Sequence, residues 1–310
     1  MIEPIIQLID VTKDFRYRGR FAHPKALQVL KGVNFSLYPG RTLALVGESG
    51  SGKSTCAQLI VKMQSVTDGK ILFKGKDIAD IKSRKEMKEY RSSVQMVFQD
   101  PFSSLNPAHS IRHHLTRPLK IHHPKTNKFV SVDQLESLLK MVGLPNDTLQ
   151  KFPHQLSGGQ KQRVNLARAI AVGSEVILAD EPTSMLDVSV RLEILNLMQE
   201  MKKKLGIGFL YITHDLVTAH TIADETAVMF QGQIVEWGDT HSIIANPQHP
   251  YTRLLIDAIP DPDSPFSELS KNNVIFGETA EKIRLISVEK QSQCLHVGPN
   301  HFVRKWQTTA

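Results

Sequence analysis

A stretch of glycine, serine and one lysine, written GESGSGKST from Gly47 to Thr55, has the residue types that bind phosphate. Glycine lets backbone N–H groups turn toward one centre, and the start of a following helix adds a partial positive charge. In such a loop the Lys53 ammonium reaches the β- and γ-phosphates of a nucleotide, and the Ser54 hydroxyl binds Mg²⁺. The spacing therefore predicts a nucleoside-triphosphate site.

The segments on either side of this loop favour the same function. Thr42–Val46 is a short apolar run that indicates a buried parallel strand, and the residues from Lys53 to Met63 indicate a helix. A phosphate-binding loop needs this order of strand, loop and helix. A turn rich in glycine and serine that matches the motif by accident need not lie between a strand and a helix.

A pair of carboxylates follows a second apolar run, Glu175–Ala179, which predicts another strand. Successive strand residues point to opposite sides, so Asp180 and Glu181 have different tasks. Asp180 can hold Mg²⁺ through its water shell, and Glu181 can polarise a water that attacks the γ-phosphate. Acids also end strands on ordinary α/β surfaces, so this pair alone leaves both interpretations open.

Two further segments point to the same chemistry. Phe209–Thr213 predicts a strand that ends at His214, and the carboxyl ends of parallel strands are where such sheets bind ligands. The sequence Leu156-Ser-Gly-Gly-Gln160 starts a helix and is a second nest for an anion. One nucleotide needs only one nest, so a second nest in the same chain requires an explanation.

Taken together, these motifs resemble those of the ATPase subunits of ABC transporters, in the expected order between residues 5 and 260. The resemblance assigns ATP to Phe15, Gly47, Glu48, Ser49, Gly50, Ser51, Gly52, Lys53, Ser54 and Thr55. It assigns catalysis to Glu181, His214 and Gln99, Mg²⁺ to Ser54, Gln99 and Asp180, the signature to Ser157, Gly158, Gly159 and Gln160, and the D-loop to Asp187. Tyr17 competes with Phe15 for stacking on adenine.

The resemblance also explains the second nest. It implies a head-to-tail dimer in which the signature of one subunit contacts ATP held by the other. Gln99 would then connect the Mg²⁺ and γ-phosphate environment to a permease. A P-loop kinase would leave the LSGGQ segment without a role.

A narrower resemblance concerns the segments Gln99–Pro107 and Asn246–Thr252, which are similar to the oligopeptide/dipeptide/nickel branch of importer ATPases. It implies two transmembrane permease subunits, a paralogous ATPase subunit or a second copy of this chain, and indirectly an extracytoplasmic solute-binding protein, with no nucleic acid. The chain would lie peripherally on the cytoplasmic face of the membrane. Peptide is the first expectation for the solute, with oligosaccharide, hinted at by Met185, and nickel as alternatives.

The implied fold is α/β: a P-loop NTPase (RecA-like) core with an antiparallel β subdomain, an inserted helical subdomain at about 91–157, and a small C-terminal appendage. We expect an ATPase domain over 1–245 and a C-terminal extension over 246–310. In that extension, 273–276 and 283–288 are expected strands. Relatives often carry a cysteine-rich motif there, but Cys294 is isolated, so we expect no iron–sulfur cluster.

Composition limits the alternatives. The chain has 310 residues, is 41% hydrophobic and carries a net charge of +7, which leaves nucleotides, lipid headgroups and nucleic acid open as partners. A soluble ABC ATPase of DNA repair or translation therefore stays as a second function, although its usual coiled coil, zinc modules or second cassette do not appear. With two cysteines, no secretory leader pattern and no long apolar run, we expect a cytosolic chain.

Residues 101–132 contain no acid, and we hypothesise that their basic side chains face an anionic membrane. A solvated charged face is the alternative. The basic residues are Arg112, Arg117, Lys120, Lys125 and Lys128, and the same stretch holds His109, His113, His114, His122 and His123. The spacing of these histidines does not favour a metal site.

Overall fold

The strand predicted before the glycine loop is β3, Thr42–Val46, and all five of its residues are buried. The computed structural model describes residues 2–17, 25–122, 130–258, 281–283 and 293–306. The chain forms two units. Unit 1 comprises Met1–Ile6, Leu37–Thr42 and Phe73–Ile212, and unit 2 comprises Gln7–Ser36, Leu43–Leu72 and Thr213–Ala310.

Unit 1 contains a parallel set of strands that corresponds to the predicted apolar runs. Strand β7 (Val176–Asp180) lies between β6 (Val94–Val97) and β8 (Gly208–Thr213). The register pairs Val97 with Ala179 and Asp180 with Ile212, so the polar residues after β6 and β7 emerge at one edge. The fold is therefore of the expected α/β class, and both predicted strands of this unit are confirmed.

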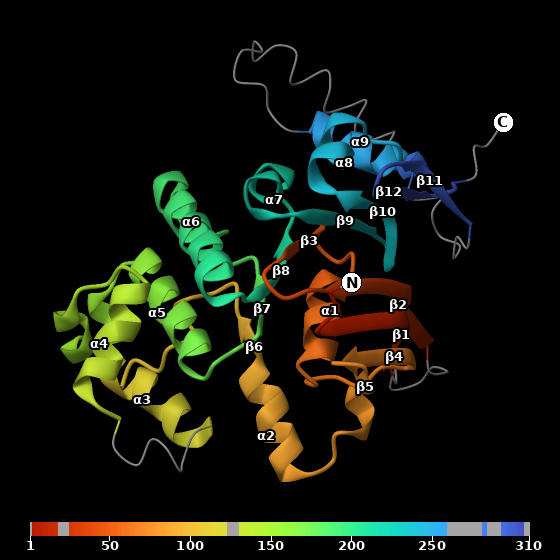
Figure 1. Ribbon diagram of the computed structural model, residues 1–310. Helices are drawn as coiled ribbons and strands as arrows, with labels where there is room; N and C mark the ends of the chain where they lie inside the picture. The colour runs from red at the N-terminus through yellow and green to blue at the C-terminus, as the bar shows by residue number, and fades with distance from the viewer. Residues whose placement is uncertain (1, 18–24, 123–129, 259–280, 284–292, 307–310) are drawn as a thin grey trace. The chain divides into compact units, whose positions relative to one another are not determined.

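Three helices of unit 1 pack against the helix that begins at the signature segment. Besides β6, β7 and β8, unit 1 contains β5 (Lys76–Asp77), η1 (Ile78–Asp80), α2 (Arg84–Ser93), α3 (Ile111–His122), α4 (Val132–Met141), η2 (Asn146–Gln150), η3 (Pro153–Gln155), α5 (Gly158–Ala171) and α6 (Val188–Leu205). Helices α3, α4 and α6 all pack against α5 (Figure 1). The range 91–157, expected to be helical, begins with the end of α2 and with β6, which is a strand because its apolar residues pair with β7.

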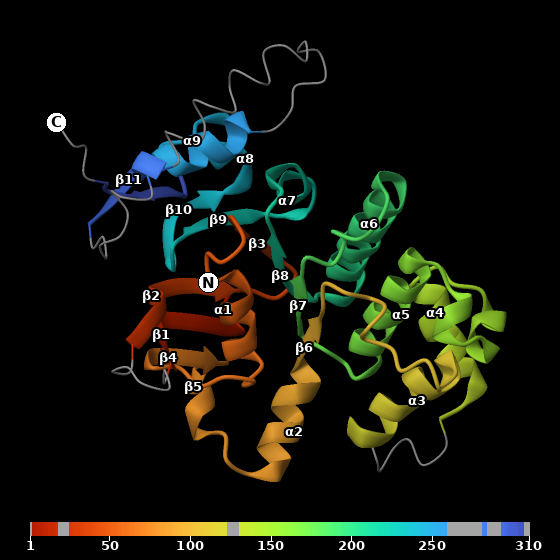
Figure 2. The ribbon, with the colours of Figure 1, turned by 180° about the vertical axis from the view of Figure 1, so that it is seen from behind.

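Unit 2 contains strands of a larger mixed sheet and strands of a smaller antiparallel sheet. In the larger sheet, β3 pairs in parallel with β9, and β9, β10, β12 and β11 follow in antiparallel order. The smaller sheet places β1 between β2 and β4 (Figure 2). The bounds of these strands are β1 Ile6–Tyr17, β2 Lys25–Leu37, β4 Asp68–Phe73, β9 Glu225–Phe230, β10 Gln233–Asp239, β11 Cys294–Gly298 and β12 His301–Arg304.

The helices of unit 2 are short, and they are α1 (Lys53–Ile60), α7 (Leu216–Ile222), α8 (Thr240–Ala245) and α9 (Pro250–Asp257). Helix α1 begins at Lys53 as predicted but ends at Ile60, before the expected Met63. The cause is Lys62, whose φ of 58° leaves the helical region and lets the Met63 N–H donate to the Gln58 carbonyl at 2.9 Å.

The C-terminal strands differ from those expected. Residues 273–276 and 284–288 lie outside the described residues, and Ile283, expected to begin a strand, is helical. Strands β11 and β12 form instead, and β12 extends the larger sheet by pairing Val303 with Glu236 of β10. The reason is that β10 offers an unpaired edge to a short alternating segment, a partner that local composition does not reveal.

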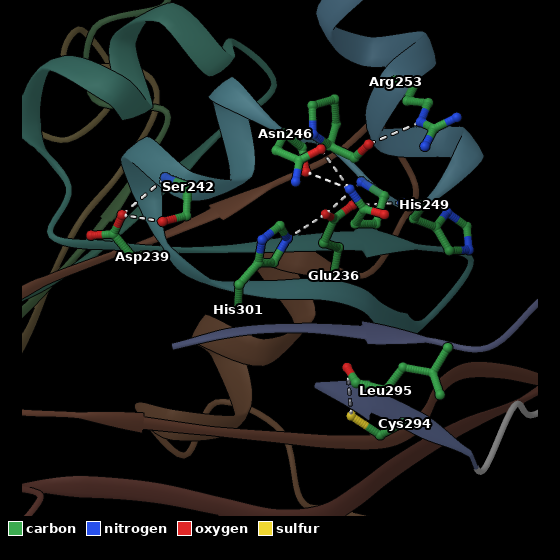
Figure 3. Close-up of polar contacts among 11 residues, drawn as sticks. Glu236, Asp239, Ser242, Asn246, His249, Arg253, Cys294, Leu295 and His301 are labelled. Carbon is green, nitrogen blue, oxygen red and sulfur yellow. Dashed lines mark hydrogen bonds and ion pairs between the residues drawn. The ribbon is translucent and has the colours of Figure 1, made fainter. Parts of the chain in front are cut away.

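A buried carboxylate holds the start of α9, as Figure 3 shows. Glu236 accepts the backbone N–H groups of Gln248 and His249 at 2.8 and 2.9 Å, and His301 Nε2 lies 2.7 Å from Glu236 Oε1. These four residues are called the Glu236 cluster below. His249 Nδ1 in turn accepts the Tyr251 N–H as the N-cap of α9. The cluster thus connects β10, β12 and α9.

Burial lowers the pKa of the His249 imidazole from 6.5 to about 4. The folded protein therefore binds this proton less readily than the unfolded chain does. As a result, the free energy of unfolding falls as the pH drops from about 6.5 toward 4. Between pH 7 and pH 5, His249 lowers the free energy of unfolding by about 2 kcal/mol. His249→Asn keeps an N-cap acceptor but does not titrate.

We therefore expect the free energy of unfolding to fall less between pH 7 and pH 5 in His249→Asn than in the wild type, by about 2 kcal/mol. Urea unfolding at the two pH values measures both slopes. Equal slopes in the two proteins would show that His249 takes up its proton as readily when folded as when unfolded.

Candidate functional site

The glycine loop of unit 2 follows β3 directly and is closed by contacts that only glycine permits. A Cβ at Gly47 would lie 2.1 Å from the Met229 carbonyl oxygen, so no side chain fits there. Gly52, at φ 108°, is the N-cap residue of α1. The backbone of the loop is consequently fixed between β9 and the start of a helix, which is the geometry that presents N–H groups to an anion.

Lys53 lies within this loop, with only 5% of its surface exposed. Its Nζ donates to the carbonyl oxygens of Gly47 at 2.6 Å and Glu48 at 2.8 Å, and lies 3.4 Å from Ser51 Oγ. A buried ammonium needs such acceptors, because burial without partners is costly. Ser54, the next residue, is exposed in the first turn of α1.

The other predicted residues of unit 2 lie on strand β1 or directly after β8. His214 is exposed directly after β8, and the Asp215 N–H after it donates to Thr213 Oγ1 at 3.0 Å. Phe15 is half-buried on β1, and the Lys13 ammonium lies 5.0 Å from the centre of its ring. The side chain of Tyr17 lies outside the described residues, so its competition with Phe15 stays open.

In unit 1 the structure brings Gln99 and Glu181 together. Gln99 Nε2 donates to Glu181 Oε2 at 2.9 Å, although the two residues are 82 positions apart. Glu181 has a φ of 44°, and its backbone N–H donates to the Ile212 carbonyl at 2.9 Å. A non-glycine residue in this region stores about 1–3 kcal/mol of strain, which is typical of functional positions. Asp180, one residue earlier, ends β7 and is half-buried.

The signature segment is the N-terminus of α5. Ser157 is the N-cap residue: its side chain accepts the Gln160 N–H at 3.3 Å, while the Gln160 side chain accepts the Ser157 N–H at 3.1 Å. This capping box fixes the first turn of a 14-residue helix. A Cβ at Gly159 would lie 2.4 Å from Val190 Cγ1, so this glycine allows α5 and α6 to approach. Ser157 itself is exposed.

The D-loop lies between β7 and α6. Asp187 is exposed and is the N-cap residue of α6, and Met185 is also exposed. Ser184 Oγ donates to the Glu181 carbonyl at 3.0 Å, so this turn also supports the strained glutamate. Gln162 of α5 donates to the Pro182 carbonyl at 2.8 Å and joins the signature helix to the same turn.

Sequence reasoning missed one contact of the loop. The Tyr251 hydroxyl of α9 accepts the Glu48 N–H at 2.9 Å. Tyr251 lies in the Asn246–Thr252 segment, whose sequence indicates only a resemblance to one branch of a family. The residue type was the one available signal, because a tyrosine hydroxyl needs a partner wherever its ring is buried.

The basic and histidine-rich stretch is partly described. Arg112, Arg117 and Lys120 are exposed on α3, whereas Lys125 and Lys128 lie outside the described residues. The rings of His109 and His113 stack at 4.1 Å between centroids. Within the described part of the chain, no helix has the length and apolarity to span a membrane.

Two family models match the chain. One, described as ABC transporter, matches residues 30–184. The other, described as oligopeptide/dipeptide transporter, C-terminal region, matches residues 235–282. The second region begins within β10 and includes the Glu236 cluster except His301.

Several relatives are similar over most of the chain. The oligopeptide transport ATP-binding protein OppF of Salmonella typhimurium is 40% identical over 260 residues, which is 84% of this chain and 78% of the relative. OppF of Bacillus subtilis is 38% identical over 92% of this chain and 93% of its own length. The glutathione import ATP-binding protein GsiA of Salmonella typhimurium is 37% identical over 98% of this chain, which spans 49% of GsiA.

Solved structures have the same fold. The structure of cbiO1 from Clostridium perfringens, part of the ABC transporter complex cbiONQ, has a TM-score of 0.65 and 30% identity, covering 78% of this chain and 91% of that one. A dimeric ATP-binding cassette in a post-hydrolysis state, bound to ADP and Pi, has a TM-score of 0.66 and 28% identity, covering 76% and 98%.

Proposed function

Since this chain belongs to the ABC transporter ATP-binding family, we propose that it powers the uptake of oligopeptides through partner permeases. The observation that carries the proposal is the match of its C-terminal region to the oligopeptide/dipeptide transporter model, beyond the cassette that many transporters share. The relatives named for oligopeptide and glutathione transport support the same solute class, because glutathione is a short peptide. Oligosaccharide, suggested by Met185, and nickel are the alternatives.

The phosphate groups of ATP would be bound by the loop Gly47–Thr55. Lys53 is already drawn into this loop by the carbonyls of Gly47 and Glu48 and needs only to exchange one acceptor for a phosphate oxygen. The N-terminus of α1 adds its partial positive charge to the same point. Phe15, half-buried on β1, is the proposed platform for adenine.

Mg²⁺ suits the donors that the sequence assigns to it. The Ser54 hydroxyl, the Gln99 amide and the Asp180 carboxylate offer oxygen ligands, which this hard cation prefers. The Gln99 amide nitrogen is directed to Glu181, so its oxygen points away from that carboxylate. When bound, the ion would neutralise charge on the β- and γ-phosphates.

Glu181 would act as the base that polarises the attacking water. Its carboxylate is oriented by the Gln99 amide, and its backbone is held in the strained region by the Ile212 carbonyl. The amide donor at 2.9 Å holds one oxygen of the carboxylate and so fixes the direction of the other. His214, exposed after β8, is the proposed partner that senses the γ-phosphate.

Glu181→Gln should therefore bind ATP but hydrolyse it about 10²–10⁴ times more slowly, because it loses the base and keeps Lys53 and Ser54. Phosphate release and ATP binding are measured on the same preparation. Glu175→Gln is the matched control, since Glu175 precedes the same strand but pairs with Lys74 at 2.7 Å. Turnover near that of the wild type in Glu181→Gln would remove Glu181 from the mechanism.

The exposed signature would bind ATP held by a second cassette. A capped helix N-terminus with an exposed serine has the partial charge and donors for a phosphate, and Ser157 meets both conditions. A solved structure of the same fold, the dimeric ATP-binding cassette bound to ADP and Pi, supports this arrangement. Asp187, exposed at the start of α6, is the proposed D-loop contact with the partner.

Ser157→Asp separates the capping role of this residue from its proposed role toward the partner's ATP. Aspartate caps a helix as well as serine does, so stability should change by less than about 0.5 kcal/mol. The added charge would repel the γ-phosphate, and ATPase activity of the assembled complex should fall about 100-fold or more.

Ser131→Asp is the control for this variant, because Ser131 caps α4 in the same unit with a matching bond to the Gln134 N–H at 3.2 Å. Thermal unfolding and steady-state ATPase rates are compared for both variants. Equal ATPase rates in Ser157→Asp and Ser131→Asp would contradict the assignment of Ser157 to nucleotide binding.

The chain would work on the cytoplasmic face of the membrane with partners that span it. We propose two permease subunits, a paralogous ATPase or a second copy of this chain, and a solute-binding protein that acts on the far side. Arg112, Arg117 and Lys120, exposed on α3, would lie toward the anionic surface.

Affinity capture of the tagged chain from detergent-solubilised membranes tests the assembly. We expect mass spectrometry to identify two multi-span proteins and an ATPase, and the captured complex to hydrolyse ATP faster with peptide-loaded binding protein than with sugar or nickel. Recovery of the chain only from the soluble fraction, on nucleic acid or ribosomes, would instead favour the soluble ABC ATPase.

A further inference from the structure

The contact between Tyr251 and the phosphate loop joins the C-terminal region to the proposed ATP site. The Tyr251 hydroxyl accepts the Glu48 N–H at 2.9 Å, across 203 positions of sequence. The tyrosine is fully buried, with 0% of its surface exposed. A phenol in such surroundings makes its hydrogen bond with a fixed direction, so it can hold the peptide group to which it binds.

Glu48 is also the residue on which the loop closes. Its carbonyl oxygen accepts Lys53 Nζ at 2.8 Å and the Ser51 N–H at 3.2 Å. The Tyr251 phenol therefore fixes the N–H group of Glu48, while the carbonyl group of Glu48 orients Lys53 and the turn at Ser51. Any rotation of the Glu48 backbone would move both of these groups together.

The position of Tyr251 is itself fixed from two sides. Its ring lies 4.2 Å from that of Phe230 between centroids, in a buried cluster that includes Val228, Val235 and Ile243. Its backbone N–H is held by His249, and the Glu236 cluster anchors the start of α9 (Figure 3). Through His301, β12 contributes to the same anchor.

We infer that Tyr251 is a positioning residue for the phosphate loop, through which the C-terminal region sets the affinity for ATP. The inference rests on the proposed nucleotide site. A loop held before the nucleotide arrives loses less conformational entropy on binding, so the hydrogen bond lowers the KM for ATP. The proposed base Glu181 is held by its own contacts with Gln99 and Ile212, so we expect kcat to be spared.

Tyr251→Phe removes the acceptor and keeps the ring that packs on Phe230. We expect the KM for ATP of the assembled transporter, and the Kd of the full chain for Mg-ATP, to rise about 3- to 10-fold, the effect of one hydrogen bond. The kcat should stay within about twofold. Hydrogen exchange of the Glu48 amide should become faster, because the N–H loses its partner.

Tyr90→Phe is the matched control, since Tyr90 is equally buried, at 1% exposure, in the other unit. It should leave the KM unchanged. If the role of Tyr251 is purely structural, Tyr251→Phe and Tyr90→Phe will both lower the thermal midpoint, and both will keep the wild-type KM for ATP. That result would overturn the inference. If the wild-type chain itself bound no ATP, the proposed function would fail instead.

A second pair of variants keeps the inference testable if Tyr251→Phe folds poorly. His301→Gln keeps an N–H donor for Glu236, and His301→Leu removes it. We expect the KM for ATP to rise in the leucine variant and to return toward the wild-type value in the glutamine variant. Equal KM values in the two variants would show that the Glu236 cluster does not act on the loop.

Discussion

The Lys53 ammonium, enclosed by backbone carbonyls of its own loop, is the interaction on which the rest of this structure depends. A buried cation is tolerated only where oxygen atoms surround it, and here Gly47 and Glu48 supply them at 2.6 and 2.8 Å. A loop that can hold a positive charge in this way is also one that gains from an incoming phosphate. Its shape is imposed from outside, by the Met229 carbonyl, which excludes any side chain at Gly47, and by the Tyr251 phenol.

The chemistry is divided between the two units, and each unit arranges its own part. Unit 2 holds the cation and the helix terminus that attract phosphate. Unit 1 holds the Gln99–Glu181 pair and the capped serine at the start of α5. In unit 1 the strained backbone of Glu181 is maintained by hydrogen bonds to Ile212 and Ser184, so the strain is offset by the sheet edge and the turn that follows it.

Much of this arrangement could be predicted from the sequence because it is local. The run before Gly47, the run before Asp180 and the start of the helix at Gly158 each depend on neighbours in the chain, and each appears at the predicted place. The contact of Tyr251 with Glu48, the pairing of β12 with β10 and the burial of Glu236 depend on residues far apart in sequence. Local composition has no means to indicate them, which is why the extension was expected only as a small appendage.

We propose above all that ATP bound at this loop drives solute uptake. The direct measurement is entry of radiolabelled oligopeptide into proteoliposomes that contain the purified complex, with Lys53→Ala introduced in this chain alone. We expect ATP-dependent uptake by the wild-type complex and, in the variant, a fall to the level measured without ATP. Unchanged uptake in the Lys53→Ala complex, or wild-type uptake that does not require ATP, would contradict it.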